Sequence, residues 1–373
     1  MADEFKKNDH LIGLSSLPGK KAQTDYSNLP YIIGTVSSPV GEIPIVKTKL
    51  EFADRLGSWK VRWSIGRSRY RVQPGLYAVG IPDDKSPVFV SANYKMSFDR
   101  LRAALHRTDG WILVIDTKGI NVWCAAGKGT FGTDEIIRRI NMVNLFEIVS
   151  HRKIIVPQLG APGIAAHTVK QITGFKIKYG PVRAKDIPQY LDDNLTATEA
   201  MRTVRFNLWD RMVLIPNDII LSLRYLLYGI LFIMVLSGLG HGFYSTEHLI
   251  HNGIVNGLIL LFIYILGHTA SPTLLPYIPG RSFSAKGGWI GLLIFLGLYY
   301  FERQSQILTF SDLEAIGWLG LSVSVSSFIA MNFTGASTYT SLSGVKKEMK
   351  IAVPIQVILA VVALGFWIAG KFI

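Results

Sequence analysis

The chain has 373 residues, with 39 Lys and Arg against 26 Asp and Glu, a net charge of +13 and one cysteine, Cys124. A single cysteine excludes an internal disulfide, and it equally excludes an iron–sulfur cluster or a multi-cysteine zinc site held by this chain alone. The charge is uneven, because residues 1–216 hold 31 Lys and Arg against 20 Asp and Glu, whereas the remainder holds 8 against 6 and consists mostly of long apolar runs.

The excess of positive charge in residues 1–216 is compatible with three partners: nucleic acid, an anionic membrane surface or an acidic protein. The basic residues are scattered, and the sequence has no nucleic-acid-binding motif. We therefore expect no nucleic-acid partner. A soluble domain held beside anionic membrane lipid explains the charge most simply.

The first 28 residues mix charge, Ser, Gly and Pro without periodicity, which predicts a mobile N-terminal tail. The opening "MADEFKKNDHLIGLSS" is polar where a signal peptide has its apolar segment, so we expect no signal peptide. A cytoplasmic soluble domain is expected over residues 29–216.

In this domain, short runs of β-branched and aromatic residues alternate with helical patterns. Strands are predicted at 59–65, 75–81, 88–94, 111–116, 153–157 and 175–180. Helices are predicted at 98–107, 133–149, with Thr133 as N-cap, and 163–173. This alternation is typical of a Rossmann-like α/β domain, with a parallel sheet covered by helices on both faces.

Two loops follow predicted strands of this sheet, and both are rich in Gly and small residues: "TKGINVWCAAGKG" (117–129) and "QLGAPG" (158–163). Ligands of such sheets bind beyond the carboxyl ends of the strands. Glycines allow a backbone to approach a large flat ligand closely. We therefore expect a binding site between the two loops.

Cys124 lies in the first of these loops. The run "NVWCAAG" predicts a short helix with Asn121 as its cap and Cys124 in its first turn, where free N–H groups favour negative charge. Lys128 adds positive charge on the same face. A thiolate there is a soft ligand for a soft metal, or a nucleophile. A buried, inert side chain is the plainer alternative.

Other sites are less well supported by the sequence. A nucleophile needs a base, and His106, His151 and His167 are candidates only by their nearness in sequence. The run "GKGT" lacks the spacing of a phosphate-binding loop. His241, His248 and His251 lie in or beside one predicted outer loop, where they hold a metal or are interfacial polar residues.

The C-terminal part predicts an all-α transmembrane domain over residues 217–373. Five apolar runs are long enough, or nearly so, to span the bilayer: 219–240, 250–269, 285–301, 314–333 and 352–370. With the soluble domain in the cytoplasm, the inner loops and helix ends carry Arg281, Lys286, Lys346, Lys347 and Lys350, and the outer ones carry Arg303 and Lys371. This bias predicts a multi-pass protein of the cytoplasmic membrane.

Several stretches are similar to a known family. They are "NVWCAAGKGTFGT" (121–133) and residues 70–82, 91–102, 156–170, 179–191 and 201–206. They resemble the corrinoid-binding domain of the corrinoid iron–sulfur protein large subunit of acetyl-CoA synthesis. Together with five membrane helices, they resemble more closely its relative, the corrinoid protein of the mercury-methylating pair. Residues 333–349 share this resemblance.

The resemblance implies a cofactor and its site. The cofactor would be a cobalamin-type corrinoid with Cys124 as the lower axial ligand of its cobalt. The helix beneath the corrin would consist of Asn121, Val122, Trp123, Ala125, Ala126, Gly127 and Lys128. The residues lining the ring and tail would be Asn93, Tyr94, Gly160, Ala161, Pro162, Gly163 and His167.

The implied activity is that of a corrinoid-dependent methyltransferase. It would take a methyl group from a methyltetrahydrofolate-derived donor and transfer it to mercury(II), giving methylmercury. A small ferredoxin with two 4Fe–4S clusters would supply electrons. Three alternatives remain: a corrinoid methyl carrier of acetyl-CoA and one-carbon metabolism, a membrane transporter with a cytoplasmic regulatory domain, and a membrane-anchored binding module in which Cys124 is merely packed. The transporter predicts polar residues in mid-membrane, and the runs hold few.

Overall fold

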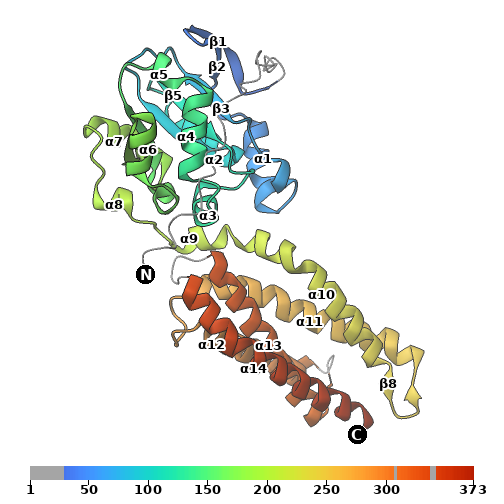
Figure 1. The fold of residues 1–373 in the computed structure, drawn as a ribbon. Coiled ribbons are helices and arrows are strands. Elements are labelled where there is room, and N and C mark those ends of the chain that lie inside the picture. The colour runs from blue at the N-terminus through green and yellow to red at the C-terminus, as the bar shows by residue number, and fades with distance from the viewer. Residues whose placement is uncertain (1–28, 306–308, 337–341) are drawn as a thin grey trace, which may run out of the picture.

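The computed structural model describes residues 29–305, 309–336 and 342–373. The tail predicted at residues 1–28 lies outside this part of the chain. The described residues form an α/β domain above a bundle of long helices (Figure 1). This arrangement agrees with the predicted order of a Rossmann-like domain followed by membrane helices, whereas the exact domain boundaries stay predictions.

The α/β domain contains a mixed sheet of seven strands in the order β1-β2-β3-β5-β4-β6-β7. The strands are β1 (Ile32–Ser38), β2 (Gly41–Val46), β3 (Gly75–Val79), β4 (Val88–Ala92), β5 (Gly110–Ile115), β6 (Lys153–Pro157) and β7 (Lys176–Gly180). β4, β5, β6 and β7 are parallel, as predicted, but β3 runs antiparallel to β5. The prediction of a wholly parallel sheet is therefore wrong. Residues 80–87, which join β3 to β4, are too few for the crossover that parallel strands need.

Helices cover both faces of the sheet, as predicted. The alternating side chains of β4 and β5 enter two separate cores: Val90 and Leu113 point into one, and Phe89 and Ile112 into the other. The helices are α1 (Phe52–Arg62), α2 (Lys95–Ala104), α3 (Val122–Gly127), α4 (Thr133–Met142), α5 (Leu145–Ile148), α6 (Ala166–Thr173), α7 (Ile187–Asp192), α8 (Glu199–Arg202) and α9 (Leu208–Met212). Two short 3₁₀ helices, η2 (Gln158–Gly163) and η3 (Ala184–Asp186), follow β6 and β7.

Some local predictions in this domain are wrong. Residues 59–65 are the end of α1 and a turn instead of a strand. The N-cap of α4 is Gly132, while the Thr133 hydroxyl accepts a hydrogen bond from the Ala165 N–H at 2.8 Å. The helix expected to continue to residue 149 breaks at Asn144, which has a left-handed backbone. The hairpin of β1 and β2 has no counterpart in the predicted strands.

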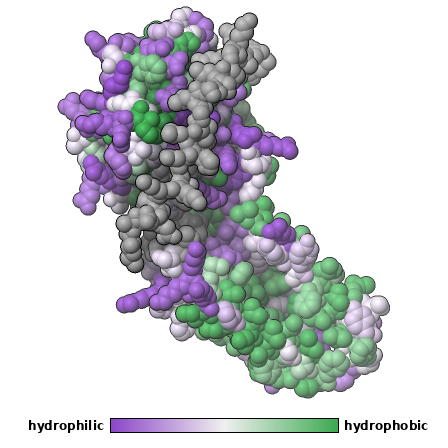
Figure 2. Space-filling view, in the orientation of Figure 1, coloured by the Kyte–Doolittle hydropathy of each residue, from purple (hydrophilic) through white to green (hydrophobic). Residues whose placement is uncertain are grey.

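The lower part contains five helices long and apolar enough to cross a membrane. They are α10 (Ile215–Ser237), α11 (Thr246–Leu274), α12 (Phe283–Ser305), α13 (Asp312–Asn332) and α14 (Leu342–Ala369). Figure 2 shows the surface of this bundle as hydrophobic, in contrast to the hydrophilic α/β domain. The five predicted spans are thus confirmed as helices. The last helix begins ten residues earlier than predicted. The prediction followed the apolar run and so left out the first turns of the helix, which carry charged residues.

Specific hydrogen bonds join the two parts. The Asn217 side-chain oxygen, at the start of α10, accepts from the Ser64 hydroxyl at 2.7 Å and from the Arg67 guanidinium at 2.8 Å. The buried Arg211 of α9 donates to the carbonyl oxygen of Pro272 on α11 at 2.7 Å. In Figure 1, α3 lies at the end of the α/β domain that is nearest to the long helices.

Candidate functional site

The loop that carries the predicted site is organised by Asn93. This residue follows β4, and its side chain is almost fully buried. Its side-chain oxygen accepts hydrogen bonds from the Thr117 N–H and the Gly119 N–H, at 3.1 and 2.9 Å, and its amide nitrogen donates to Asp116 at 3.1 Å. Asn93 was expected to line the ligand. In the structure its polar atoms hold the loop from β5 to α3.

Helix α3 is the predicted short helix, and its cap is confirmed. The Asn121 side-chain oxygen accepts a hydrogen bond from the Cys124 N–H at 2.9 Å, which fixes the first turn. The helix has two faces. Val122, Ala125 and Ala126 are buried in the core, whereas Trp123, Cys124, Gly127 and Lys128 are exposed. The thiol is therefore a surface group at the carboxyl edge of the sheet, and it is not packed as the plainer alternative required.

The two glycines of η2, Gly160 and Gly163, pack closely against other parts of the chain. A Cβ atom at Gly160 would collide with the ring of Phe131, and one at Gly163 would collide with the Phe131 carbonyl oxygen and lie 3.2 Å from Ala126 Cα. These glycines let η2 pack against the segment around α3. Ala161 is half-buried between them, and Pro162 is exposed.

Gly127 has the open surroundings that the η2 glycines lack. Apart from its chain neighbours and the backbone of its own helix, no described atom lies within 4 Å of the point where its Cβ atom would be. Gly127 lies three residues after Cys124, so it belongs to the same stretch of helix surface. The space over this face of α3 is therefore open to a flat ligand.

Basic residues surround Tyr94, which lies close to the thiol. Burial raises the pKa of the Tyr94 hydroxyl, Arg67, Arg62 and Arg100 act to lower it, and the charge of Cys124 raises it. The Arg67 guanidinium lies 5.9 Å from the centre of the Tyr94 ring. Tyr94 is buried and belongs to the apolar core of the domain.

The arginines crowd one another. Burial and the positive charge of Arg100 both lower the pKa of Arg62. Three positive charges therefore lie near Tyr94, and positive charge favours an anionic ligand group. These arginines were not among the predicted site residues, because they come from three separate segments and share no motif.

A cavity of about 760 Å³ adjoins α3. Asn121, Val122 and Trp123 form one wall, and the cavity extends along α2 to the loop after β7. Arg100, His106, Arg183 and Lys185 also line it, together with Asp210, which pairs with Arg183 at 3.0 Å. The cavity is large enough for an extended, negatively charged group of a cofactor.

The histidines proposed as bases are separated in the structure. His151 precedes β6, at the opposite edge of the sheet from Cys124, and its ring contacts the Ser86 carbonyl oxygen at 2.9 Å. His167 is exposed in the first turn of α6, and His106 lines the cavity. Within residues 29–305, 309–336 and 342–373, no three His, Cys, Asp or Glu side chains are grouped so that they could hold a metal ion. His241, His248 and His251 therefore form no such group.

The comparisons with known proteins match part of the α/β domain. Residues 63–191 match the family "CO dehydrogenase/acetyl-CoA synthase delta subunit". The gamma subunit of the acetyl-CoA decarbonylase/synthase complex of Methanopyrus kandleri is 30% identical over 128 residues, which are 34% of this chain and 27% of that protein. The Archaeoglobus fulgidus gamma subunit is 29% identical over 130 residues, which are 34% of this chain and 27% of that protein.

A third similar protein is the corrinoid/iron–sulfur protein large subunit of Moorella thermoacetica. It is 27% identical over 129 residues, which are 34% of this chain and 28% of that protein. This chain therefore spans just over a quarter of the length of these relatives. The family match falls within the α/β domain and includes α3. Over this region, the chain is similar to the corrinoid/iron–sulfur protein large subunit.

Proposed function

We propose that this protein is a membrane-anchored, corrinoid-dependent methyltransferase that methylates mercury(II). One observation supports the proposal most strongly. The only thiol of the chain is exposed on an Asn121-capped helix at the carboxyl edge of the sheet, inside the region related to corrinoid iron–sulfur proteins. The proposal gives this thiol a role as the lower ligand of cobalt.

The residues around Cys124 suit such a cofactor. A thiolate sulfur is a soft donor, and soft donors suit transition metals. The open surface at Gly127 leaves room for a large ring, and the adjoining cavity leaves room for its substituents. The arginines near Tyr94 favour an anionic ligand over a neutral one.

Several residues of α3, and the cap residue before it, have a task in this proposal. When bound, the corrinoid supplies a cobalt centre that carries a methyl group and releases it with its bonding electrons or as a radical. Cys124 would hold the cobalt centre through an anionic, electron-rich sulfur. Asn121 holds the first turn so that the sulfur stays in place. The buried Val122, Ala125 and Ala126 fasten the helix to the core.

Mercury(II) is proposed as the acceptor because it is an electrophile. An electrophile takes a methyl group that leaves electron-rich, and a soft anionic sulfur ligand would favour that mode of release. A methyltetrahydrofolate-derived donor would supply the methyl group. A separate ferredoxin with two 4Fe–4S clusters would supply electrons, because one cysteine cannot hold a cluster.

The names of the relatives favour a second candidate. They are subunits of acetyl-CoA decarbonylase/synthase complexes and a corrinoid/iron–sulfur protein. In the second candidate, this chain would carry a methyl group as a cation in one-carbon metabolism. The two candidates differ in the acceptor: an electrophile such as mercury(II), or a nucleophile such as a thiolate or a reduced metal centre.

The test uses the purified full chain, loaded with a corrinoid and given a methyl donor and a low-potential reductant. Wild-type protein should form methylmercury from mercury(II) and show a sulfur-to-cobalt charge-transfer band, and Cys124→Ala should lose both. The exposed Lys170 on α6 gives a matched control, and Lys170→Ala should keep both.

Two outcomes would decide against the proposal. Full mercury methylation by the Cys124→Ala variant would exclude a required role for the Cys124 sulfur as a cobalt ligand. Transfer of the methyl group to a thiol acceptor, with none to mercury(II), would instead support the carrier of one-carbon metabolism. X-ray absorption at the cobalt edge reports the ligand atom independently of activity.

A further inference from the structure

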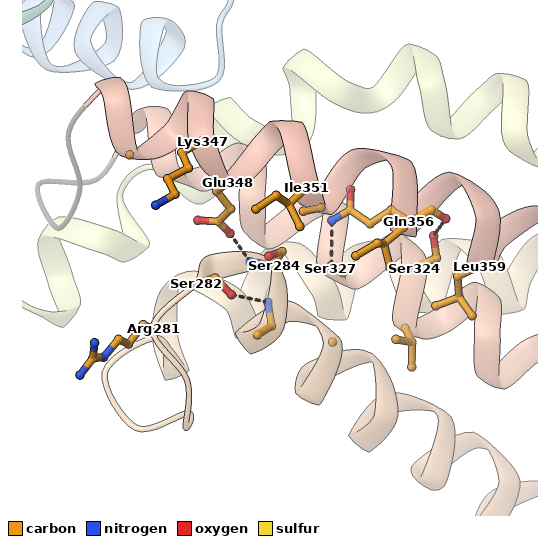
Figure 3. Close-up of a pocket in the computed structure, with 16 residues that line it drawn as sticks. Arg281, Ser282, Ser284, Ser324, Ser327, Lys347, Glu348, Ile351, Gln356 and Leu359 are labelled. Atoms are coloured by element: carbon orange, nitrogen blue, oxygen red, sulfur yellow. Dashed lines mark hydrogen bonds between the residues drawn. The ribbon is translucent and has the colours of Figure 1, made fainter.

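A groove of about 750 Å³ lies in the membrane domain, far in sequence from Cys124 (Figure 3). Its floor is α13, which contributes Val323, Ser324 and Ser327. Its walls are α12 and the first half of α14. On α14, Ile351 and Ile355 border the groove and are each about 60% exposed, so the groove is open on the side that the bilayer would cover.

One end of the groove is cationic. Arg281, just before α12, and Lys347, in the first turns of α14, line this end together (Figure 3). The nearby Glu348 carboxylate accepts a hydrogen bond from the Ser284 N–H at 2.6 Å, which ties α14 to α12. This end lies where α12 begins and α13 ends, on the same side of the bundle as the α/β domain (Figure 1). A negatively charged group is therefore favoured there.

A buried amide lies deeper in the groove. Gln356 is 6% exposed, and its side-chain nitrogen donates to the Ser327 hydroxyl at 2.8 Å. Its side-chain oxygen has no hydrogen-bond partner among the described residues. A hydroxyl both donates and accepts, so Ser327 can pair with either end of the amide and leaves the other end without a partner. A buried amide atom without a partner is costly, and it calls for a polar group from outside the chain.

The polar and apolar parts of the groove follow one another in a definite order. Gln356 lies eight residues beyond Glu348, which is about 12 Å along a helix, and helical side chains lean back toward the N-terminus. Apolar side chains continue the wall through Ile355 to Leu359. The sequence of charge, buried amide and apolar wall corresponds to the phosphate, ester and acyl chain of a phospholipid.

We propose that this groove binds one anionic phospholipid from the leaflet beside the α/β domain. Its phosphate contacts Arg281 and Lys347. An ester carbonyl accepts a hydrogen bond from the Gln356 amide, with the Ser327 hydroxyl donating to the other end of that amide. One acyl chain lies along Ile355 and Leu359.

The experiment counts lipids on the full chain. The protein is placed in nanodiscs of palmitoyl-oleoyl phosphatidylglycerol and phosphatidylcholine in equal amounts, released into mild detergent and weighed by native mass spectrometry. Wild-type protein should keep one phosphatidylglycerol in preference to phosphatidylcholine. Glycerol phosphate added in excess should not displace it, because the acyl chain holds the lipid in the groove.

Two double variants separate the groove from general surface charge. Arg281→Gln with Lys347→Gln should weaken phosphatidylglycerol retention about 30-fold, since each basic residue near anionic lipid contributes about fivefold. Lys346→Gln with Lys350→Gln removes the same charge from the same end of α14 but from residues outside the groove lining, and it should change retention far less. Gln356→Leu keeps the two cations, and it should also reduce retention.

Three outcomes would overturn the proposal. They are equal loss in the two double variants, equal retention of the two lipids by wild-type protein, and displacement by glycerol phosphate, which would identify a soluble phosphate as the ligand. Thermal unfolding of each variant, followed by circular dichroism, shows whether it is folded. If the first double variant is unfolded, the lipid preference of wild-type protein and of Gln356→Leu still decides.

Discussion

The α/β domain and the membrane domain bury polar groups in opposite ways. In the α/β domain, Arg102 is fully buried and pairs with Asp54 and Asp99, each at 2.8 Å. Lys95 contacts the same two carboxylates, each at 2.7 Å, so four charges form one network beside α2. Helices α1, which carries Asp54, and α2, which carries the other three residues, are held together by charge as well as by apolar packing.

The membrane domain joins its helices through small residues. Ser322 of α13 is fully buried and donates a hydrogen bond to the Gly291 carbonyl oxygen on α12 at 2.8 Å. A Cβ atom at Gly287 would lie 2.7 Å from Ser327 Cα, and one at Gly317 would lie 2.8 Å from Trp367 Cα. In a bilayer, apolar side chains gain little by leaving lipid, so close backbone approach and hydrogen bonds must hold the helices together. Helices are therefore held together by different forces in the α/β domain and in the bundle of long apolar helices.

Breaking the charge network should have the largest effect. Arg102→Met would leave the buried Asp99 and the partly buried Asp54 without their arginine, and it should destabilise the α/β domain by about 3–5 kcal/mol. Limited proteolysis and thermal unfolding of the full chain measure this. Arg138→Met is the control, because Arg138 is 53% exposed where it pairs with Glu135, and it should cost at most about 1 kcal/mol. Equal losses would show that the network adds no stability beyond that of a surface pair.

The interface between α12 and α13, which is built from small residues, should not tolerate a larger side chain. Gly287→Ala would force α12 and α13 apart and should destabilise the membrane domain by about 1–3 kcal/mol. Gly297→Ala, on the same helix, is the control because no other described atom lies within 4 Å of its Cβ position. It should be neutral or slightly stabilising, since Ala is the better helix former. Denaturation in detergent, followed by circular dichroism, compares the two, and identical behaviour would contradict close backbone packing.

The smallest effect should come from pH. Burial acts to raise the pKa of Asp54, but hydrogen bonds from Lys95, the Glu51 N–H and Arg102 outweigh it and hold this pKa below its usual value. The pKa is therefore lower in the folded than in the unfolded protein, so the stabilisation is present above about pH 4 and is lost as the pH falls further. Thermal unfolding between about pH 5 and pH 3 should show this decline, and Asp54→Asn should flatten it. Parallel curves for the two proteins would exclude Asp54 as the cause.

The sequence predicted best those elements whose signal is local and strong. The five membrane helices follow from long apolar runs, and β4 and β5 follow from short runs buried on both faces. The strand expected at 59–65 is wrong because Trp59, Val61, Trp63 and Ile65 alternate with polar residues by coincidence. The structure exposes both tryptophans and Ile65. The true signal is upstream, where Glu51 and Asp54 form the capping box of α1.

In the site, too, the features with a local sequence signal were predicted and those that depend on tertiary packing were not. The cap at Asn121 and the first-turn position of Cys124 depend on neighbouring residues, and both were predicted correctly. The arrangement of Arg62, Arg67 and Arg100 around Tyr94 depends on how α1, the loop after it and α2 pack, which no short motif encodes. The role of Asn93 was missed for a related reason, because its hydrogen-bond partners lie more than twenty residues away.

Because Cys124 is exposed, the order in which a soft metal ion and the proposed cofactor bind to this protein matters. Mercury(II) binds thiolates tightly, so a bare sulfur on α3 would capture the ion before any methyl group is available. A sulfur already bonded to cobalt is shielded from that capture. Under the proposed function, cofactor loading would therefore have to come first, and the apoprotein would be the form that mercury(II) inactivates.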